Sequence, residues 1–148
     1  MGDRSKSFGR VSFLALALSS AAVSGAAQDY RVIVNAANPG SQIKRDVLAM
    51  IYLKGRARWA DGKPVAAVDQ SARSPVRATF TEQALGQDVQ AVQNQWIRSI
   101  QVGQGTPPPV KSTDEDVVAF VKSNPNAIGY VSADTPLDGA VKALKVVE

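Results

Sequence analysis

The polar residues best suited to binding chemistry gather in one short stretch, Val68 to Phe80, which reads VDQSARSPVRATF. It holds two serines, Ser71 and Ser74, and two arginines, Arg73 and Arg77. Guanidinium groups bind phosphate or carboxylate through paired hydrogen bonds, and serine hydroxyls can donate to oxyanion oxygens. These residue types, so close together, predict a site for a small anion.

The same stretch has the pattern of a helix start. Ser74 suits the N-cap, and Pro75 suits the first helical position, where its missing N–H costs nothing. We expect the helix to run to about Leu85, with Gly86 ending it. The free N–H groups of its first turn and the positive end of its dipole favour an anion. The apolar run at 65–69 predicts a strand just before it, and open α/β sheets place ligands at such junctions.

A purely structural interpretation explains the same residues. Ser74 caps its own helix, while Arg73 and Arg77 are solvated or paired with Asp69 and Glu82. Neither Gly nor Thr follows Ser74, so the loop lacks the bare backbone that lets a phosphate approach closely. On the residues alone, this second interpretation is favoured.

The composition argues against catalysis. The chain contains no His and no Cys, which excludes Ser-His catalysis, His-ligated zinc, thiol nucleophiles and disulfides. The acidic cluster Asp114–Asp116 reads as the first turn of a helix rather than as a pair of catalytic carboxylates. We therefore predict a protein that is not an enzyme and that has no cofactor and no metal site.

The first 27 residues have the pattern of a secretory signal peptide. Three basic residues precede an apolar run at 11–23, and the small residues 24–27 suit a signal peptidase. The alternative is an uncleaved anchor, but the apolar run is shorter than the ~20 residues of a membrane span. We expect cleavage near Ala27, export to the periplasm and no membrane attachment after cleavage.

The remaining residues, 28–148, predict one domain of ordinary size. Residues 1–27 hold three of the 17 basic and one of the 13 acidic residues, so the rest carries a formal charge of about +2. No run of Lys and Arg occurs there, and a nucleic-acid partner is not expected.

The elements expected along this domain alternate in type. A strand at 31–35 precedes a helix capped by Ser41, with Ile43, Val47, Leu48 and Ile51 on one face. After the turn at 59–64, the strand at 65–69 and the helix from Ser74, Asp88 caps a helix that carries Trp96. A proline loop at 103–109, a capping box at Ser112–Glu115 and strands at 127–131 and from Val141 complete the order. This alternation predicts an α/β fold with a central sheet flanked by helices.

Three segments resemble the periplasmic receptors of phosphate ABC transporters. RVIVNAANPG (31–40) is similar to the strand and turn that begin the second lobe of those receptors. IYLKGRARWADGKPVAAVD (51–69) resembles a helix, a W.DG turn and a strand, and AFVKSNPNAIGYVS (119–132) resembles their AIGYV segment. The segments occur in the family's order. The resemblance implies a single lobe of a type II periplasmic binding protein with a central mixed sheet.

The resemblance also implies a ligand and a set of contacts. The family's loop in this lobe has Arg, three residues and Ser-Gly-Thr, where this chain has Gln70 and Ser74-Pro75-Val76. We therefore expect phosphate or a related small oxyanion to contact Ser74, with Ser71, Arg73, Arg77 and Gln70 supporting it. Nothing matches the first lobe, so binding by the isolated lobe should be weak. An ABC transporter is the partner that the resemblance suggests.

The alternative comes from another functional class. A single lobe exposes the face that a second lobe would cover, and such surfaces often form interfaces. The chain would then be a protein-interaction or dimerisation module without a ligand, pairing with a second copy of itself or an envelope partner. The aromatic residues considered for such a surface are Tyr52, Trp59 and Trp96, although the helical spacing of Trp96 favours the core.

Overall fold

The computed structural model describes residues 29–55 and 57–148. The signal peptide expected at 1–27 lies outside these residues. The strands are β1 (Tyr30–Asn35), β2 (Gln42–Lys44), β3 (Ala66–Ala67), β4 (Asp69–Gln70), β5 (Val110–Lys111), β6 (Ala127–Ser132) and β7 (Val141–Val147). The helices are α1 (Arg45–Lys54), α2 (Pro75–Leu85), α3 (Val89–Gln101) and α4 (Asp114–Ser123).

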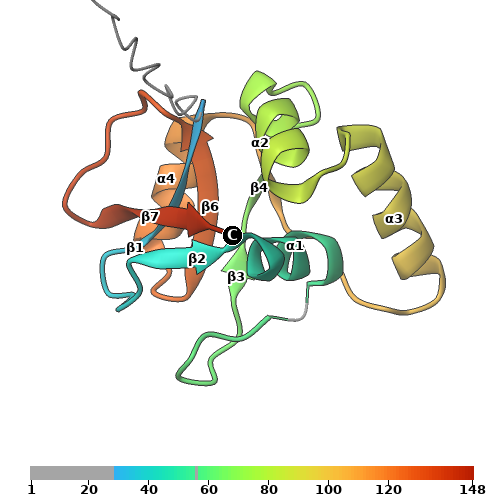
Figure 1. Ribbon diagram of the computed structural model, residues 1–148, viewed down its shortest axis with the longest axis horizontal. Coiled ribbons are helices and arrows are strands. Elements are labelled where there is room, and N and C mark those ends of the chain that lie inside the picture. Colours follow the sequence, from blue (N-terminus) through green and yellow to red (C-terminus); the bar gives the residue numbers. More distant parts are fainter. Residues whose placement is uncertain (1–28, 56) are drawn as a thin grey trace, which may run out of the picture.

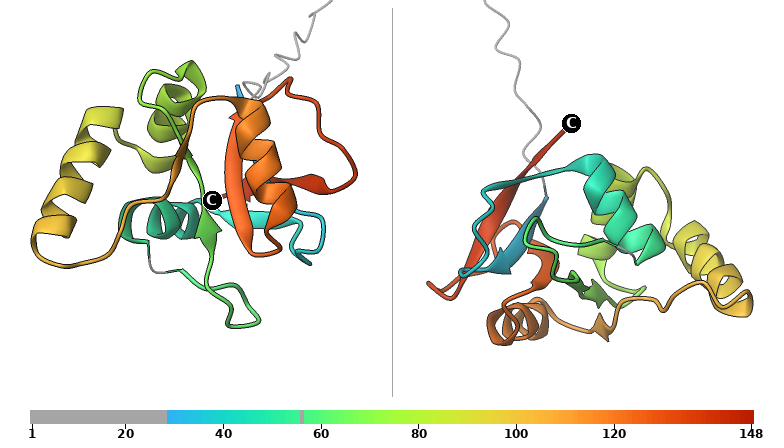
Figure 2. Two further views of the ribbon diagram at one scale, coloured as in Figure 1. Left: turned by 180° about the vertical axis from the view of Figure 1, so that it is seen from behind. Right: turned by 90° about the horizontal axis from the view of Figure 1, so that it is seen from below.

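The central sheet is mixed and has the strand order β2-β7-β1-β6-β3. β1 pairs antiparallel with β6 and β7, while β2 runs parallel to β7 and β3 runs parallel to β6. Helix α4 covers one face of this sheet, and α1 lies on the opposite side (Figure 2). Helix α3 lies at the end of the molecule away from β1 and β7 (Figure 1). The expected α/β fold with a central mixed sheet flanked by helices is confirmed.

Alternation along the central strands separates two apolar cores. Val32 and Val34 of β1 join the core beneath α1 and α2, whereas Ile33 joins the core beneath α4. Gly129 of β6 lies beneath α4, where an added Cβ would stand 2.7 Å from a methyl of Val117. That distance is far inside van der Waals contact, so α4 packs closely on the sheet only because position 129 lacks a side chain.

The helix expected after Ser41 begins later than predicted. Ile43 belongs to strand β2, and α1 begins at Arg45 without a side-chain cap from Lys44. The reason is tertiary, because β7 offers β2 a parallel edge and Lys145 N donates to Ser41 O at 3.0 Å. A distant strand therefore overrides the local capping pattern.

Two other boundaries differ from the sequence pattern. The strand expected at 65–69 divides into β3 and β4, and β4 leaves the main sheet to pair in parallel with β5. The N-cap of α4 is Thr113 rather than Ser112, because the Thr113 hydroxyl accepts from Asp116 N at 3.1 Å. The helix at 75–85, its Gly86 end and the Asp88 cap of α3 are confirmed.

Candidate functional site

The stretch from Asp69 to Arg77 forms the connection from β4 to α2. Its backbone is fastened to β5, because Asp69 N donates to Pro109 O at 2.8 Å and Ser71 N to Lys111 O at 2.9 Å. β4 and β5 run parallel, and each leads within a few residues into a helix start, α2 after one and α4 after the other. The fold thus brings two helix N-termini to one place.

A pocket of about 380 Å³ opens between these two helix starts. Four of the five residues expected at the site line it, namely Gln70, Ser71, Arg73 and Ser74. The opposite wall comes from the α4 side and from the end of β6, with the lining residues Ser112, Thr113, Asp114 and Ser132. The fifth expected residue, Arg77, is not part of the lining.

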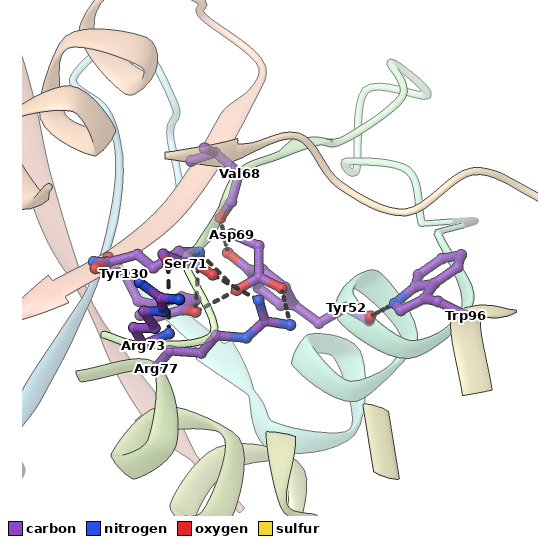
Figure 3. Close-up of polar contacts among 9 residues, drawn as sticks. Tyr52, Val68, Asp69, Ser71, Arg73, Arg77, Trp96 and Tyr130 are labelled. Carbon is purple, nitrogen blue, oxygen red and sulfur yellow. Dashed lines mark hydrogen bonds and ion pairs between the residues drawn. The ribbon is translucent and has the colours of Figure 1, made fainter. Parts of the chain in front are cut away.

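Arg77 lies beneath the loop and is only 6% exposed. Its Nη2 stands 3.2 Å from Asp69 Oδ2, and its Nη1 donates to Gln70 O at 2.6 Å. Figure 3 shows its side chain directed to the Asp69 carboxylate. These contacts match the pairing with Asp69 that the structural interpretation allowed. Arg77 therefore stabilises the loop instead of lining the pocket.

Asp69 also holds the aromatic core to this loop. Its Oδ1 accepts from the Tyr130 hydroxyl and from Gln70 N at 2.8 Å. Burial, and then the charge of Asp69, raise the pKa of Tyr130 far above its usual value. The same two causes raise the pKa of the buried Tyr52, whose hydroxyl donates to Val68 O at 3.1 Å. Both phenols therefore stay protonated and serve as hydrogen-bond donors.

The side chain of Gln70 bridges the two helix starts. Its Nε2 donates to Asp114 Oδ1 at 2.8 Å and to Tyr130 O at 2.9 Å, which fixes the orientation of the amide. Its Oε1 accepts from the Ser74 hydroxyl at 2.8 Å. Ser74 is at the N-cap, as expected, but its hydroxyl makes no capping bond. The Ser74 hydroxyl instead donates its hydrogen bond to Gln70 Oε1.

Asp114 is a pocket residue that the sequence reasoning did not assign to the site. Its Oδ2 accepts from Ser132 N at 3.2 Å and from the Thr135 hydroxyl at 2.8 Å. Burial alone would raise its pKa, but hydrogen bonds from Ser132, Gln70 and Thr135 outweigh burial and hold the pKa below its usual value. The pocket therefore contains a carboxylate at neutral pH. The sequence pattern that could have identified Asp114 is a second helix start that follows a short strand.

The charged donor still available lies on the α2 side. Arg73 is exposed, and within the described residues its guanidinium has no hydrogen bond or ion pair. The first turn of α2 contains no acid, whereas the first turn of α4 contains three, Asp114, Glu115 and Asp116. The positive end of the α2 dipole is therefore uncompensated, and that of α4 is matched by its own side chains.

Two absences among residues 29–55 and 57–148 bear on the kind of site. This part of the chain brings together no group of three or more acidic side chains that would hold a metal ion. No helix in it has both the length and the apolar character needed to cross a bilayer.

Several solved structures with a similar fold are described as phosphate-binding or phosphate transport proteins. One, from Clostridium perfringens, is assigned as a phosphate ABC transporter substrate-binding protein and has phosphate bound; it matches with a TM-score of 0.63 at 21% identity over 80% of this chain and 44% of its own. A phosphate transport receptor from Vibrio cholerae matches with a TM-score of 0.61 at 23% identity over 80% of this chain and 46% of its own. PstS from Borrelia burgdorferi gives a TM-score of 0.60 at 12% identity over 80% and 47%.

These likenesses establish the fold. The chain has the fold of a single lobe of a periplasmic binding protein. It spans less than half the length of the solved structures that it matches. No protein-family model and no curated protein sequence matches it.

Proposed function

We propose that this chain is a non-catalytic solute-binding lobe that recognises phosphate or a related small oxyanion in the pocket between α2 and α4. The observation that carries the proposal is the uncompensated start of α2 beside the exposed guanidinium of Arg73. An oxyanion there would accept hydrogen bonds from Arg73, from the Ser71 hydroxyl and from Val76 N, the first free N–H of the helix. The fold neighbours support this ligand class, because they are phosphate receptors.

The other three residues of the expected site act through the loop in this proposal. Arg77 and Gln70 position the backbone and side chains around the pocket. Ser74 holds the Gln70 amide in place, because its hydroxyl donates to Gln70 Oε1 at 2.8 Å. A ligand that displaced Gln70 from Ser74 would gain one donor and break one internal bond, so the exchange brings little net affinity.

Binding should be weak in the isolated lobe. The pocket is open to water, which screens each contact, and the carboxylate of Asp114 repels an anion placed near it. Each hydrogen bond to a charged group contributes ~1.5–3 kcal/mol, and no second lobe adds any. We expect a dissociation constant of ~1 mM, equivalent to about 4 kcal/mol.

The setting that we propose follows from the same fold. Residues 1–27 would direct export, and residues 28–148 would work in the periplasm as one domain. The fold neighbours include ABC transporter receptors, so a transporter is the partner class that this proposal suggests.

Thermal unfolding with phosphate and with sulfate at equal ionic strength tests the proposal. A ligand at 100 times its dissociation constant adds about 2.7 kcal/mol, a shift of several degrees for a domain of this size. We expect a shift with phosphate that Arg73→Gln abolishes. The matched control is Arg98→Gln, which removes an exposed arginine from α3 and should leave the shift intact. An equal shift in both variants would contradict the assignment to this pocket.

A second candidate function rests on the end of α3. Ile97, Ile100 and Val102 are 52%, 55% and 67% exposed, an apolar group of the kind found at interfaces. Tyr52 and Trp96 are buried in the core and do not contribute to such a surface. The chain would then be an interaction or dimerisation module without a ligand. Sedimentation at increasing concentration tests it, because Ile97→Asp should abolish any dimer, and a monomer at all concentrations would exclude self-association.

A further inference from the structure

A second pocket, of about 450 Å³, lies at the opposite end of β6. Three turns form it, at 37–40, 59–63 and 125–126, together with Leu144 of β7. β6 separates it from the pocket at Ser132 by its whole length, about 20 Å for six extended residues. The two pockets therefore share no lining residue and can be tested independently.

The turns around this second pocket are held by their own hydrogen bonds. Gly62 N donates to Trp59 O at 2.8 Å, and Trp59 N donates to Lys63 O at 2.9 Å. The Trp59 indole Nε1 donates to Asn126 O at 2.9 Å, which ties the ring to the turn before β6. The ring packs partly on the core beneath α1 and lines the pocket. The pocket is therefore preformed, which lowers the entropy cost of binding a ligand.

Asn38 brings a free polar group to this pocket. It is only 6% exposed, and its Oδ1 accepts from Gly40 N at 2.8 Å. Its Nδ2 donates to no group among residues 29–55 and 57–148, yet it is not one of the buried unpartnered atoms there, which are Arg31 Nε and Arg77 Nε. Nδ2 therefore reaches the open pocket, where a ligand acceptor can replace water as its partner. The pocket thus offers one hydrogen-bond donor, from a turn that the bond from Gly40 N to Asn38 Oδ1 holds in place.

The charges at the rim favour a neutral ligand. Asp61 and Lys63 both line the pocket and stand 3.6 Å apart, with more than half of each side chain exposed. Their charges cancel at the pocket mouth. Asp61 can accept a hydrogen bond, and Lys63 can donate one.

We propose that this pocket binds the ring of a neutral saccharide. Such a ring has an apolar C–H face, which would pack on Trp59 and Leu144. Its hydroxyl groups both accept and donate, which suits the Asn38 amide and the Asp61 carboxylate at once. A phosphate or a hydrocarbon satisfies only one of these two demands. The site is separate from the oxyanion pocket and is independent of its proposed function.

Nuclear magnetic resonance of the ¹⁵N-labelled protein tests this proposal, with glucose as a free sugar and maltotriose as a glycan chain. The chain has two tryptophans, and Trp59→Phe identifies which indole signal belongs to Trp59. We expect saturable shifts of that signal and of the amides at 37–40 and 59–63. Addition of sugar up to about 100 mM would saturate a millimolar site. Tighter binding of maltotriose than of glucose would identify a glycan chain as the ligand, and equal binding would identify a single ring.

Asn38→Asp is the decisive variant. It keeps the acceptor for Gly40 N and removes the Nδ2 donor, so the turn survives while sugar affinity falls about tenfold. The matched control, Asn94→Asp at an exposed position of α3, makes the same chemical change and should leave sugar affinity unchanged. The proposal is overturned if neither sugar shifts the Trp59 indole, or if Asn38→Asp and Asn94→Asp bind the sugars equally.

Discussion

The starts of α2 and α4 face each other across one pocket. They differ in whether acidic side chains compensate the positive end of the helix dipole. α4 compensates its dipole internally, with a Thr113 cap and three acids in its first turn. α2 begins with proline, has no acid in its first turn and lies beside the free guanidinium of Arg73. The two helix starts therefore present different electrostatics to the same pocket, and only the α2 start leaves positive charge uncompensated by acids of its own first turn.

A second contrast lies within the α2 region, between the two arginines. Arg73 is exposed at the pocket, whereas Arg77 is buried against Asp69. Arg73 is one residue from Ser74 and Arg77 is three residues from it. Their roles differ because the Arg73 side chain is exposed to solvent, whereas the Arg77 side chain lies beneath the loop. Substitutions at the two arginines and at the two helix starts test these contrasts.

The largest expected effect comes from Arg77→Leu. Removing the guanidinium leaves Asp69 buried and unpaired, and breaking a buried pair costs about 3–5 kcal/mol. Arg73→Leu makes the same change at an exposed position and should alter stability by less than about 0.5 kcal/mol. Urea unfolding of both variants measures the difference. Equal losses of stability would show that Arg77 does not fasten the loop.

The next effect concerns the α4 side and pH. Asp114→Asn removes a carboxylate that accepts from Gln70, Ser132 and Thr135, and we expect a loss of about 1–3 kcal/mol at pH 7. The pKa of Asp114 is lowered in the folded protein. The Asp114 carboxylate therefore stabilises the fold fully above the pKa that it has in the unfolded chain. This stabilisation is lost as the pH falls through the pKa that Asp114 has in the folded protein.

The stability difference between wild type and Asp114→Asn should accordingly shrink below about pH 4. Urea midpoints between pH 7 and pH 3 give this profile. Glu115→Gln changes an exposed acid in the same turn and serves as the control. A difference that stayed constant with pH would mean that the carboxylate charge does not contribute.

The smallest effect is on the ligand. Asp114→Asn removes a negative charge from the pocket wall and should tighten phosphate binding about three- to tenfold. Glu115→Gln, which lies outside the lining, should change it less than about twofold. Calorimetric titration at low ionic strength compares the two variants. Unchanged affinity in Asp114→Asn would place the anion elsewhere.

Patterns that depend on neighbours in sequence were predicted well. The helix at 75–85 between Pro75 and Gly86 and the Asp88 cap of α3 follow from local chemistry, and the structure has each of them. The strand at β6 also follows, since its β-branched and aromatic residues and the turn before it are local signals.

Features set by distant partners were missed. Ser41 resembles a cap, but β7 draws Ile43 into a strand instead. Ser74 stands at the N-cap of α2, but its hydroxyl donates to Gln70 Oε1 and makes no capping bond. Gln70 is held in that position by its bond to Asp114, 44 residues along the chain. Asp114 enters the pocket only because β4 and β5 pair, a contact that no local pattern predicts.

The proposed function depends most on whether the anion binds at the start of α2 or at the start of α4. Titration of phosphate into the ¹⁵N-labelled protein, with every backbone amide followed, tests this directly. We predict that the amides of Ser71, Arg73 and Val76 shift together and saturate, while the amide of Glu115 at the α4 start hardly moves. Saturating shifts centred on the α4 start, or none at either start, would contradict the account.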